Sequence, residues 1–182
     1  MLRAHGFLEG ARRVESPNCD ERPAGAAITL LVVHAISLPP GQFGGDAIER
    51  LFTNRLDPRA HPAFAALEGL RVSAHFLLRR DGELVQFVAA DKRAWHAGRS
   101  CWRGREHCND FSIGVELEGD GLHPFSDTQY AGLVALAARL RRQFPLRDVA
   151  GHEDVAPQRK QDPGPQFNWL RVLRALATGD IR

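Results

Sequence analysis

The chain has 182 residues, 43% of them hydrophobic, so it is long enough for one sizeable core and too short for two comfortable domains. Its 24 basic and 22 acidic residues are interleaved, which disfavours the concentrated basic stripe of a nucleic-acid-binding protein. The N-terminus lacks the apolar run of a signal peptide, and no segment approaches the roughly 18 apolar residues of a membrane span. We therefore expect one cytoplasmic domain over residues 1–182, monomeric, with no nucleic-acid or membrane partner.

The first strong element is the apolar, β-branched run 28–34 (ITLLVVH). It predicts a strand that is buried on both faces and ends at His34. A loop rich in proline and glycine follows this strand. Apolar residues at helical spacing then predict a short helix over about residues 45–54.

Three further segments are strand-like. The runs 72–78 and 83–88 flank residues 80–82 (RDG), where Asp-Gly favours the positive φ angles of a tight turn, so we expect an antiparallel hairpin. The segment 111–117 (FSIGVEL) alternates, with its apolar residues on one face. Glu116 is therefore predicted to lie on the opposite face.

Two helices are predicted in the second half of the chain. Ser126 and Gln129 have the spacing of a capping box, and apolar residues then recur at helical intervals until Pro145 ends the pattern. A last helix has one apolar face, which we expect to pack against the sheet and which is formed by Trp169, Val172, Leu173 and Leu176. Because strands and helices interleave, we expect an α/β (α+β) fold with a mixed central sheet flanked by helices.

Residues 151–165 (GHEDVAPQRKQDPGP) form a segment that contains several candidate functional side chains. It concentrates His152, Lys160 and Asp162 among prolines and glycines that argue against a regular helix. In an extended backbone, Lys160 and Asp162 would point the same way, with an ammonium beside a carboxylate. A catalytic zinc takes three protein ligands from histidine and carboxylate and keeps one position open. We predict that His152 and Asp162 supply two of them and a distant histidine the third.

Among the eight histidines of the chain, His34 is the best placed to be the third ligand. It ends a buried strand immediately before a loop, and ligands gather where strands end at the edge of an open α/β sheet. This argument does not rank His75 and His96. Each could donate a hydrogen bond behind a ligand, contact substrate or simply pack, since a histidine is more often a surface or core residue than a ligand.

Five strings give the sequence a specific resemblance: LLVVHAISLPPGQFGG, RVSAHFLLRRDGE, RAWHAG, GREHCNDFSIGVELEG and GHEDVAPQRKQDPG. In this order they resemble the AmpD-type branch of the N-acetylmuramoyl-L-alanine amidases, a family related in fold to phage lysozyme-like amidases and peptidoglycan recognition proteins. The resemblance runs through nearly the whole chain. It implies a hydrolase with one Zn²⁺ per chain. Its implied substrate is a muropeptide of the anhydromuramoyl-tripeptide type, cut between (1,6-anhydro-)N-acetylmuramic acid and L-alanine during cell-wall recycling.

The resemblance also implies a role for each site residue. It makes His34, His152 and Asp162 the zinc ligands, and Glu116 and Lys160 the catalytic side chains. Glu116 would act as general base and then proton donor, and Lys160 would stabilise the developing oxyanion. Residues that lie close to substrate in the family correspond here to Arg71, Trp95, His107, Asn109 and Asp110. A guanidinium suits the carboxylates of a cell-wall peptide better than an ammonium does.

Three positions depart from the family pattern. Ala35 stands where the family has asparagine, so an amide that could orient substrate or water is missing. His107 stands where arginine is usual and Glu153 where a small residue is usual, so recognition of the peptide carboxylates could differ. Zinc binding and hydrolysis do not require the family's usual residues at the positions of His107 and Glu153.

The alternative from another class is a non-catalytic module that binds peptidoglycan fragments, because the same fold hosts recognition proteins that have lost metal ligands. This chain retains every ligand that the resemblance implies. A zinc peptidase that acts on ordinary peptides is disfavoured, since neither HExxH nor its inverted form occurs in the sequence.

Overall fold

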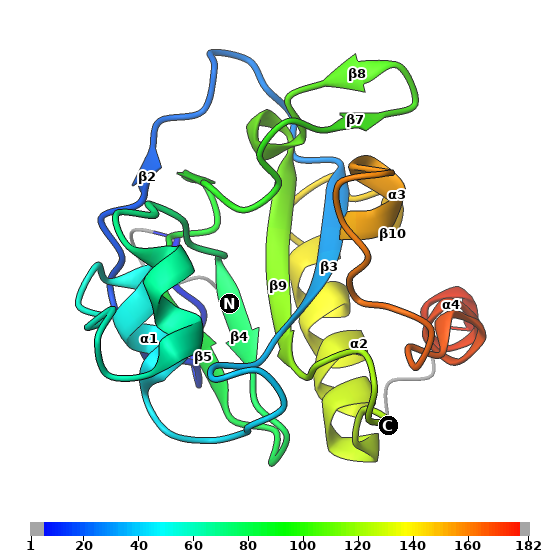
Figure 1. Cartoon of the computed structure of the whole chain (residues 1–182). Helices are drawn as coiled ribbons and strands as arrows, with labels where there is room; N and C mark the ends of the chain where they lie inside the picture. Colours follow the sequence, from blue (N-terminus) through cyan, green and yellow to red (C-terminus); the bar gives the residue numbers. More distant parts are fainter. Residues whose placement is uncertain (1–5, 179–182) are drawn as a thin grey trace.

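A mixed sheet is the centre of the fold in the computed structural model, which describes residues 6–178 (Figure 1). Its strand order is β1-β5-β4-β9-β3-β10. The strands are β1 (Arg12–Arg13), β3 (Leu30–Ile36), β4 (Phe76–Leu78), β5 (Leu84–Gln86), β9 (Ser112–Glu118) and β10 (Asp148–Gly151). Within this sheet β4 and β5 are antiparallel and the other neighbours are parallel, which confirms the predicted mixed sheet and its hairpin.

Shorter elements surround this sheet. Two small ribbons pair β2 (Cys19–Asp20) with β6 (Arg93–Ala94), and β7 (Cys101–Trp102) with β8 (Arg105–Glu106). The helical elements are α1 (Ala47–Phe52), α2 (Asp127–Arg141), α3 (His152–Val155), α4 (Trp169–Thr178) and the 3₁₀ turns η1 (Pro62–Leu67) and η2 (Cys108–Asp110). None of the helices in residues 6–178 has the length and apolar composition needed to cross a membrane.

The two faces of the sheet are covered differently (Figure 1). Helix α2 covers one face, where its apolar side chains pack on Leu31, Val33, Ile113 and Val115. Helix α1 and the η1 turn cover part of the other face, against Leu77. We call these the α2 face and the site face. Because side chains alternate along a strand, His34 and Glu116 lie on the site face.

The strand predicted over residues 28–34 is shifted in the structure. β3 runs from Leu30 to Ile36, so the prediction that the strand ends at His34 is wrong. Its ladder with the parallel strand β9 continues through the pair Ile36 and Glu118, beyond the end of the apolar run. Backbone pairing, which the apolar pattern does not report, therefore sets this strand end.

The predicted helices are present, with one change of packing. Ser126 and Gln129 form the predicted capping box at the start of α2. Val172 of α4 is buried as predicted, but Leu173 is 49% exposed. Helix α4 packs mainly on α2, which already covers that face, so the expectation that α4 would pack directly on the sheet is met only at the sheet edge. Trp169 still reaches the edge strand β10 at Gly151.

The segment 151–165 contains one helical turn, α3, where the sequence argued against a regular helix. The turn forms because the Asp154 carboxylate accepts a hydrogen bond of 2.7 Å from the Gly151 amide and so caps its start. Pro157 lies beyond the end of α3 and leaves its hydrogen bonds intact. His152 is therefore held by a helix start, while Asp162 lies in the irregular chain that follows.

Candidate metal centre

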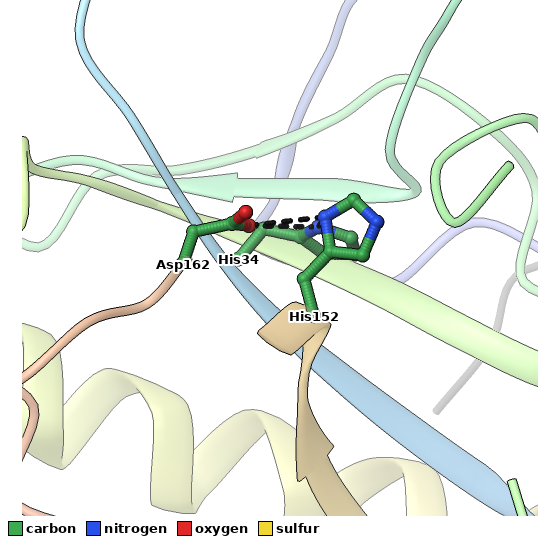
Figure 2. A group of neighbouring side chains, drawn as sticks. All are labelled: His34, His152 and Asp162. Carbon is green, nitrogen blue, oxygen red and sulfur yellow. Dashed lines mark hydrogen bonds and ion pairs between the residues drawn. The ribbon is translucent and has the colours of Figure 1, made fainter. Parts of the chain in front are cut away.

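Three side chains converge at the carboxyl end of β3 (Figure 2). His34 lies in β3, His152 begins α3, and Asp162 belongs to the loop after α3. The Nδ1 atoms of the two histidines are 2.9 Å apart. Asp162 Oδ2 lies 3.1 Å from His152 Nδ1 and 3.3 Å from His34 Nδ1. These three residues form a group that can hold a metal ion.

The parallel pairing of β10 with β3 brings the group together. Gly151 lies opposite Val33 in this ladder, so the next residue, His152, emerges beside His34. A side chain at Gly151 would not fit, since a Cβ there would lie 2.9 Å from Pro163 Cδ. The amide of Glu153 donates a 2.8 Å hydrogen bond to the carbonyl of Asp162, which ties the loop back to α3.

Hydrogen bonds behind the group show that its donor atoms suit a cation. His152 Nε2 lies 3.2 Å from the carbonyl oxygen of Ala97, which can only accept, so Nε2 donates and Nδ1 is the ring nitrogen left to offer a lone pair to a metal. That lone pair faces His34 Nδ1 and the Asp162 carboxylate. Ligand atoms around a tetrahedral zinc with bonds of about 2.0–2.1 Å lie about 3.3 Å apart, close to the spacing found here.

The ionisation of the group also suits a cation. Burial lowers the pKa of His34 to about 4, so its imidazole is neutral at pH 7. Burial alone would raise the pKa of Asp162, but the nearby His152 and His34 outweigh it and hold that pKa well below its usual range. A neutral imidazole and a carboxylate are the forms in which these side chains bind metal.

Glu116 lies beside this group on the same face of the sheet. It is the partner of His34 in the β3–β9 ladder, and paired residues of parallel strands point to the same side. Its side chain is buried, and Oε2 has no hydrogen-bond partner within the described residues. Burial and the nearby charge of Asp162 raise the pKa of Glu116 well above its usual value, while the charge of Lys160 opposes that rise. Such a carboxyl group can accept and return a proton during a reaction.

A cavity of about 530 Å³ opens beside the group and is lined by all five predicted metal-binding and catalytic residues. Of the residues predicted to bind substrate, Arg71, Trp95 and Asn109 line it as well. Arg71 is exposed and Trp95 half-buried. The side-chain oxygen of Asn109 accepts hydrogen bonds from the amides of His96 and Ala97, so this residue also holds the cavity wall in place.

His107 and Asp110 are not among the residues that line this cavity. His107 borders a separate hollow with the β7–β8 ribbon and the end of α3. Asp110 forms an ion pair of 2.6 Å with Arg93. That these two residues contact substrate therefore stays a prediction.

Two of the positions that depart from the family pattern lie near the group. Ala35 follows His34 and borders the cavity, and it packs against the core of the α2 face. Glu153 follows His152 and is partly buried, which raises the pKa of its carboxyl group.

Sequence reasoning missed two arginines near this site. Arg159 lines the cavity and donates hydrogen bonds of 2.6 and 2.8 Å to the carbonyls of Ala97 and Arg99. Arg22 is half-buried and donates to several backbone carbonyls, among them that of Ser112 at 2.8 Å. Both arginines bond residues more than 50 positions away, so no local pattern could have identified them.

Comparison with known proteins supports one family. The family model described as N-acetylmuramoyl-L-alanine amidase matches residues 24–165. The 1,6-anhydro-N-acetylmuramyl-L-alanine amidase AmpD of Escherichia coli (strain K12) is 57% identical over 173 residues, which cover 94% of each chain. The corresponding AmpD of Haemophilus influenzae is 47% identical over 174 residues, 94% of this chain and 95% of the relative.

Solved structures agree with this assignment. The crystal structure of a selenomethionine AmpD derivative superposes with a TM-score of 0.93 at 56% identity and covers 97% of this chain and 99% of its own. The E. coli amidase AmiD was solved with the substrate anhydro-N-acetylmuramic acid-L-Ala-D-γ-Glu-L-Lys. It has a TM-score of 0.60 at 30% identity and covers 86% of this chain and 65% of its own. The resemblance read from the sequence is confirmed, and the chain belongs to the N-acetylmuramoyl-L-alanine amidase family.

Proposed function

We propose that this chain is a zinc-dependent amidase that hydrolyses the amide bond between 1,6-anhydro-N-acetylmuramic acid and L-alanine in peptidoglycan fragments. The observation that carries the proposal is the convergence of His34, His152 and Asp162 beside the buried Glu116, at the wall of one cavity. Family membership supports the type of bond. The names of the AmpD relatives and the ligand of the AmiD complex support the anhydro form of the sugar.

In this proposal, one zinc ion is held by His34, His152 and Asp162. When bound, zinc lowers the pKa of water to about 7 and polarises a carbonyl group. Glu116 is the proton carrier of the site. Its buried carboxylate accepts a proton from the attacking water and delivers it to the alanine nitrogen as the amide bond breaks.

Lys160 supplies a positive charge to the same site. It lines the cavity and is close enough to affect the pKa of both Glu116 and His34 through its charge. The carbonyl oxygen of the substrate gains negative charge as water adds to it. An ammonium group already in place stabilises that charge without reorganisation, which lowers the barrier.

The cavity suits a sugar linked to a short peptide. Its volume of about 530 Å³ lies in the range of small-molecule sites. Arg71 is exposed at the cavity wall, where its guanidinium can bind a peptide carboxylate. Trp95 offers a half-buried aromatic surface against which a sugar or peptide can pack.

We further propose that residues 1–182 form one domain that acts as a monomer in the cytoplasm. Strands from the N-terminal part (β1) and the C-terminal part (β10) of the chain belong to one sheet, which supports a single domain. Light scattering after size exclusion tests the monomer, and cell fractionation tests the compartment. A dimer or an extracytoplasmic pool would contradict these two proposals.

The decisive test of the activity is the Asp162→Ala protein, assayed on anhydromuramoyl-tripeptide by mass spectrometry. We expect the parent chain to contain about one zinc and to release free peptide and sugar, and the variant to lose both zinc and turnover. Full activity of the variant would overturn the metal assignment. Binding of the fragment without cleavage by the parent chain would instead identify a non-catalytic peptidoglycan-binding module.

A further inference from the structure

We propose that His96 and Ser112 are positioning residues that fix the ring tautomer of His34 and so aim its Nδ1 lone pair at the metal. They do this through a hydrogen-bonded series, which we call the outer chain, that runs from His34 through His96 and Ser112 to the carbonyl of Cys108. This inference rests on the proposed zinc centre. It assigns roles to two residues that are neither proposed zinc ligands nor proposed catalytic side chains.

The outer chain is continuous and buried. His34 Nε2 lies 2.9 Å from His96 Nδ1. His96 Nε2 lies 3.2 Å from Ser112 Oγ, and Ser112 Oγ lies 2.6 Å from the carbonyl oxygen of Cys108. All four residues are buried, and His34 and His96 also line the cavity.

The carbonyl at the end of the outer chain sets the direction of every bond. A carbonyl oxygen only accepts, so the Ser112 hydroxyl must donate its single proton to Cys108. Ser112 Oγ can then only accept from His96, which places a proton on His96 Nε2. In a neutral imidazole the other nitrogen, Nδ1, is an acceptor, and it accepts from His34 Nε2. His34 Nδ1 is left with a lone pair.

The reverse direction would disable the ligand. If His96 donated from Nδ1, then His34 Nε2 would have to accept, and the ring proton of His34 would sit on Nδ1. That proton would point at His152 Nδ1 and Asp162 Oδ2, which lie 2.9 and 3.3 Å away. A metal could bind only after the ring had changed tautomer. The Ser112 hydroxyl thus prevents the His34 tautomer that carries its proton on Nδ1, although Ser112 does not contact His34.

The His96 ring is held in one orientation by its surroundings. It lies directly against Gly114 of β9, where an added Cβ would be 2.5 Å from His96 Cγ. The Asn109 side chain holds the His96 amide, and the ring of His75 packs edge-on with a centroid distance of 5.6 Å. This packing keeps both ring nitrogens of His96 in line with their partners. Glycine at position 114 is therefore needed for the His96 ring to occupy this position.

The first test compares Ser112→Ala with Ser16→Ala in the full chain. Ser16 is a matched control, because it is also buried, donates to a carbonyl (Phe52) and accepts one hydrogen bond (from Asn18), but belongs to no part of the outer chain. Zinc affinity is measured by competition with a chelator. We expect Ser112→Ala to weaken zinc binding about 10- to 100-fold, as loss of a group behind a ligand typically does, and Ser16→Ala to leave it unchanged.

A second readout reports the tautomer directly. In two-bond ¹H–¹⁵N spectra of the zinc-free protein, we expect His34 to carry its proton on Nε2, and Ser112→Ala to mix both tautomers. A merely structural role for Ser112 would lower stability without moving these signals. Equal zinc affinity in the parent chain and Ser112→Ala, or an unchanged tautomer, overturns the inference.

If Ser112→Ala does not fold, two substitutions at His96 test the proposed positioning role instead. His96→Asn keeps an acceptor oxygen near the Nδ1 position, whereas His96→Phe keeps a ring without nitrogens. We expect His96→Asn to bind zinc within a few-fold of the parent chain and His96→Phe to lose about 10- to 100-fold. Equal affinities of these two variants overturn the inference alone. A parent chain that binds no zinc overturns the proposed metal centre and this inference together.

Discussion

The two faces of the central strands differ in kind, although they share one backbone. On the α2 face, β3 and β9 present Leu31, Val33, Ile113 and Val115 to a helix, and this contact is apolar. On the site face, the same strands present His34, Ser112 and Glu116, all of them buried. Because consecutive side chains point to opposite faces of the sheet, one residue of a strand packs in the core and the next lies in the candidate site. Substitutions on the two faces should therefore have different consequences.

The largest effect is expected from Glu116→Gln on the site face. Amidase turnover should fall about 10²- to 10⁴-fold, because an amide cannot carry the proton. Thermal stability should stay unchanged or rise, since the buried carboxylate has an oxygen without a hydrogen-bond partner. Zinc content, turnover and unfolding are measured on the same preparation. Turnover within ten-fold of the parent chain would show that another group carries the proton.

On the α2 face, Leu133→Ala should act on stability alone. Leu133 is fully buried between α2 and the sheet, so its truncation should cost about 2–5 kcal/mol of unfolding free energy in urea. Turnover at a temperature where the variant is folded should match that of the parent chain. Leu170→Ala, at a position 58% exposed, is the control and should stay within about 0.5 kcal/mol. A loss of turnover in folded Leu133→Ala would contradict the expectation that residues on the α2 face affect stability alone.

A smaller effect is expected from the ion pairs at the far end of the site face. Arg79 is buried and bonds both Glu49, at 2.7 Å, and Glu118, at 3.1 Å. Hydrogen bonds from Arg12 and then Arg79 lower the pKa of Glu49 below its ordinary value of 4.5. A carboxyl group whose pKa is lower in the folded state contributes stability above its unfolded pKa and loses it as the pH falls through the folded one.

We therefore expect the free energy of unfolding to decline as the pH drops below about 4.5, and Glu49→Gln to flatten that decline. Urea titrations between about pH 3 and 7 measure it. The pH dependence of zinc binding should stay unchanged in this variant, because Glu49 is not among the residues that line the cavity. An identical decline in parent and variant would place the responsible carboxylate elsewhere.

The smallest effect is expected at Ala35. The family resemblance implies asparagine here, and Ala35 borders the cavity next to His34 while it packs against the core of the α2 face. One added hydrogen bond to substrate or water is worth about 0.5–1.5 kcal/mol, so Ala35→Asn should raise turnover about 2- to 10-fold. Steady-state assays of both proteins on anhydromuramoyl-tripeptide measure this. Unchanged turnover would show that the missing amide has no part in orienting the substrate.

Local patterns predicted much of the fold because each depends on a few neighbouring residues. The capping box of Ser126 and Gln129 and the hairpin turn at residues 80–82 each depend on no more than four residues, and both are found in the structure, although only Gly82 of the turn has a positive φ. The end of β3 and the packing of α4 could not be predicted this way. They depend on how far the β9 ladder continues and on which face α2 has already covered.

The sequence by itself determined the family, the mixed sheet and the residues that can ligate a metal, since motif, alternation and residue chemistry are local properties. Only the tertiary structure decided how closely His34 approaches His152 and Asp162, and that His96 lies beside His34. That decision depends on two parallel ladders, β10 with β3 and β3 with β9, that place residues more than 100 positions apart within hydrogen-bonding distance. Contacts of that range follow from register and packing, which no short stretch of sequence specifies.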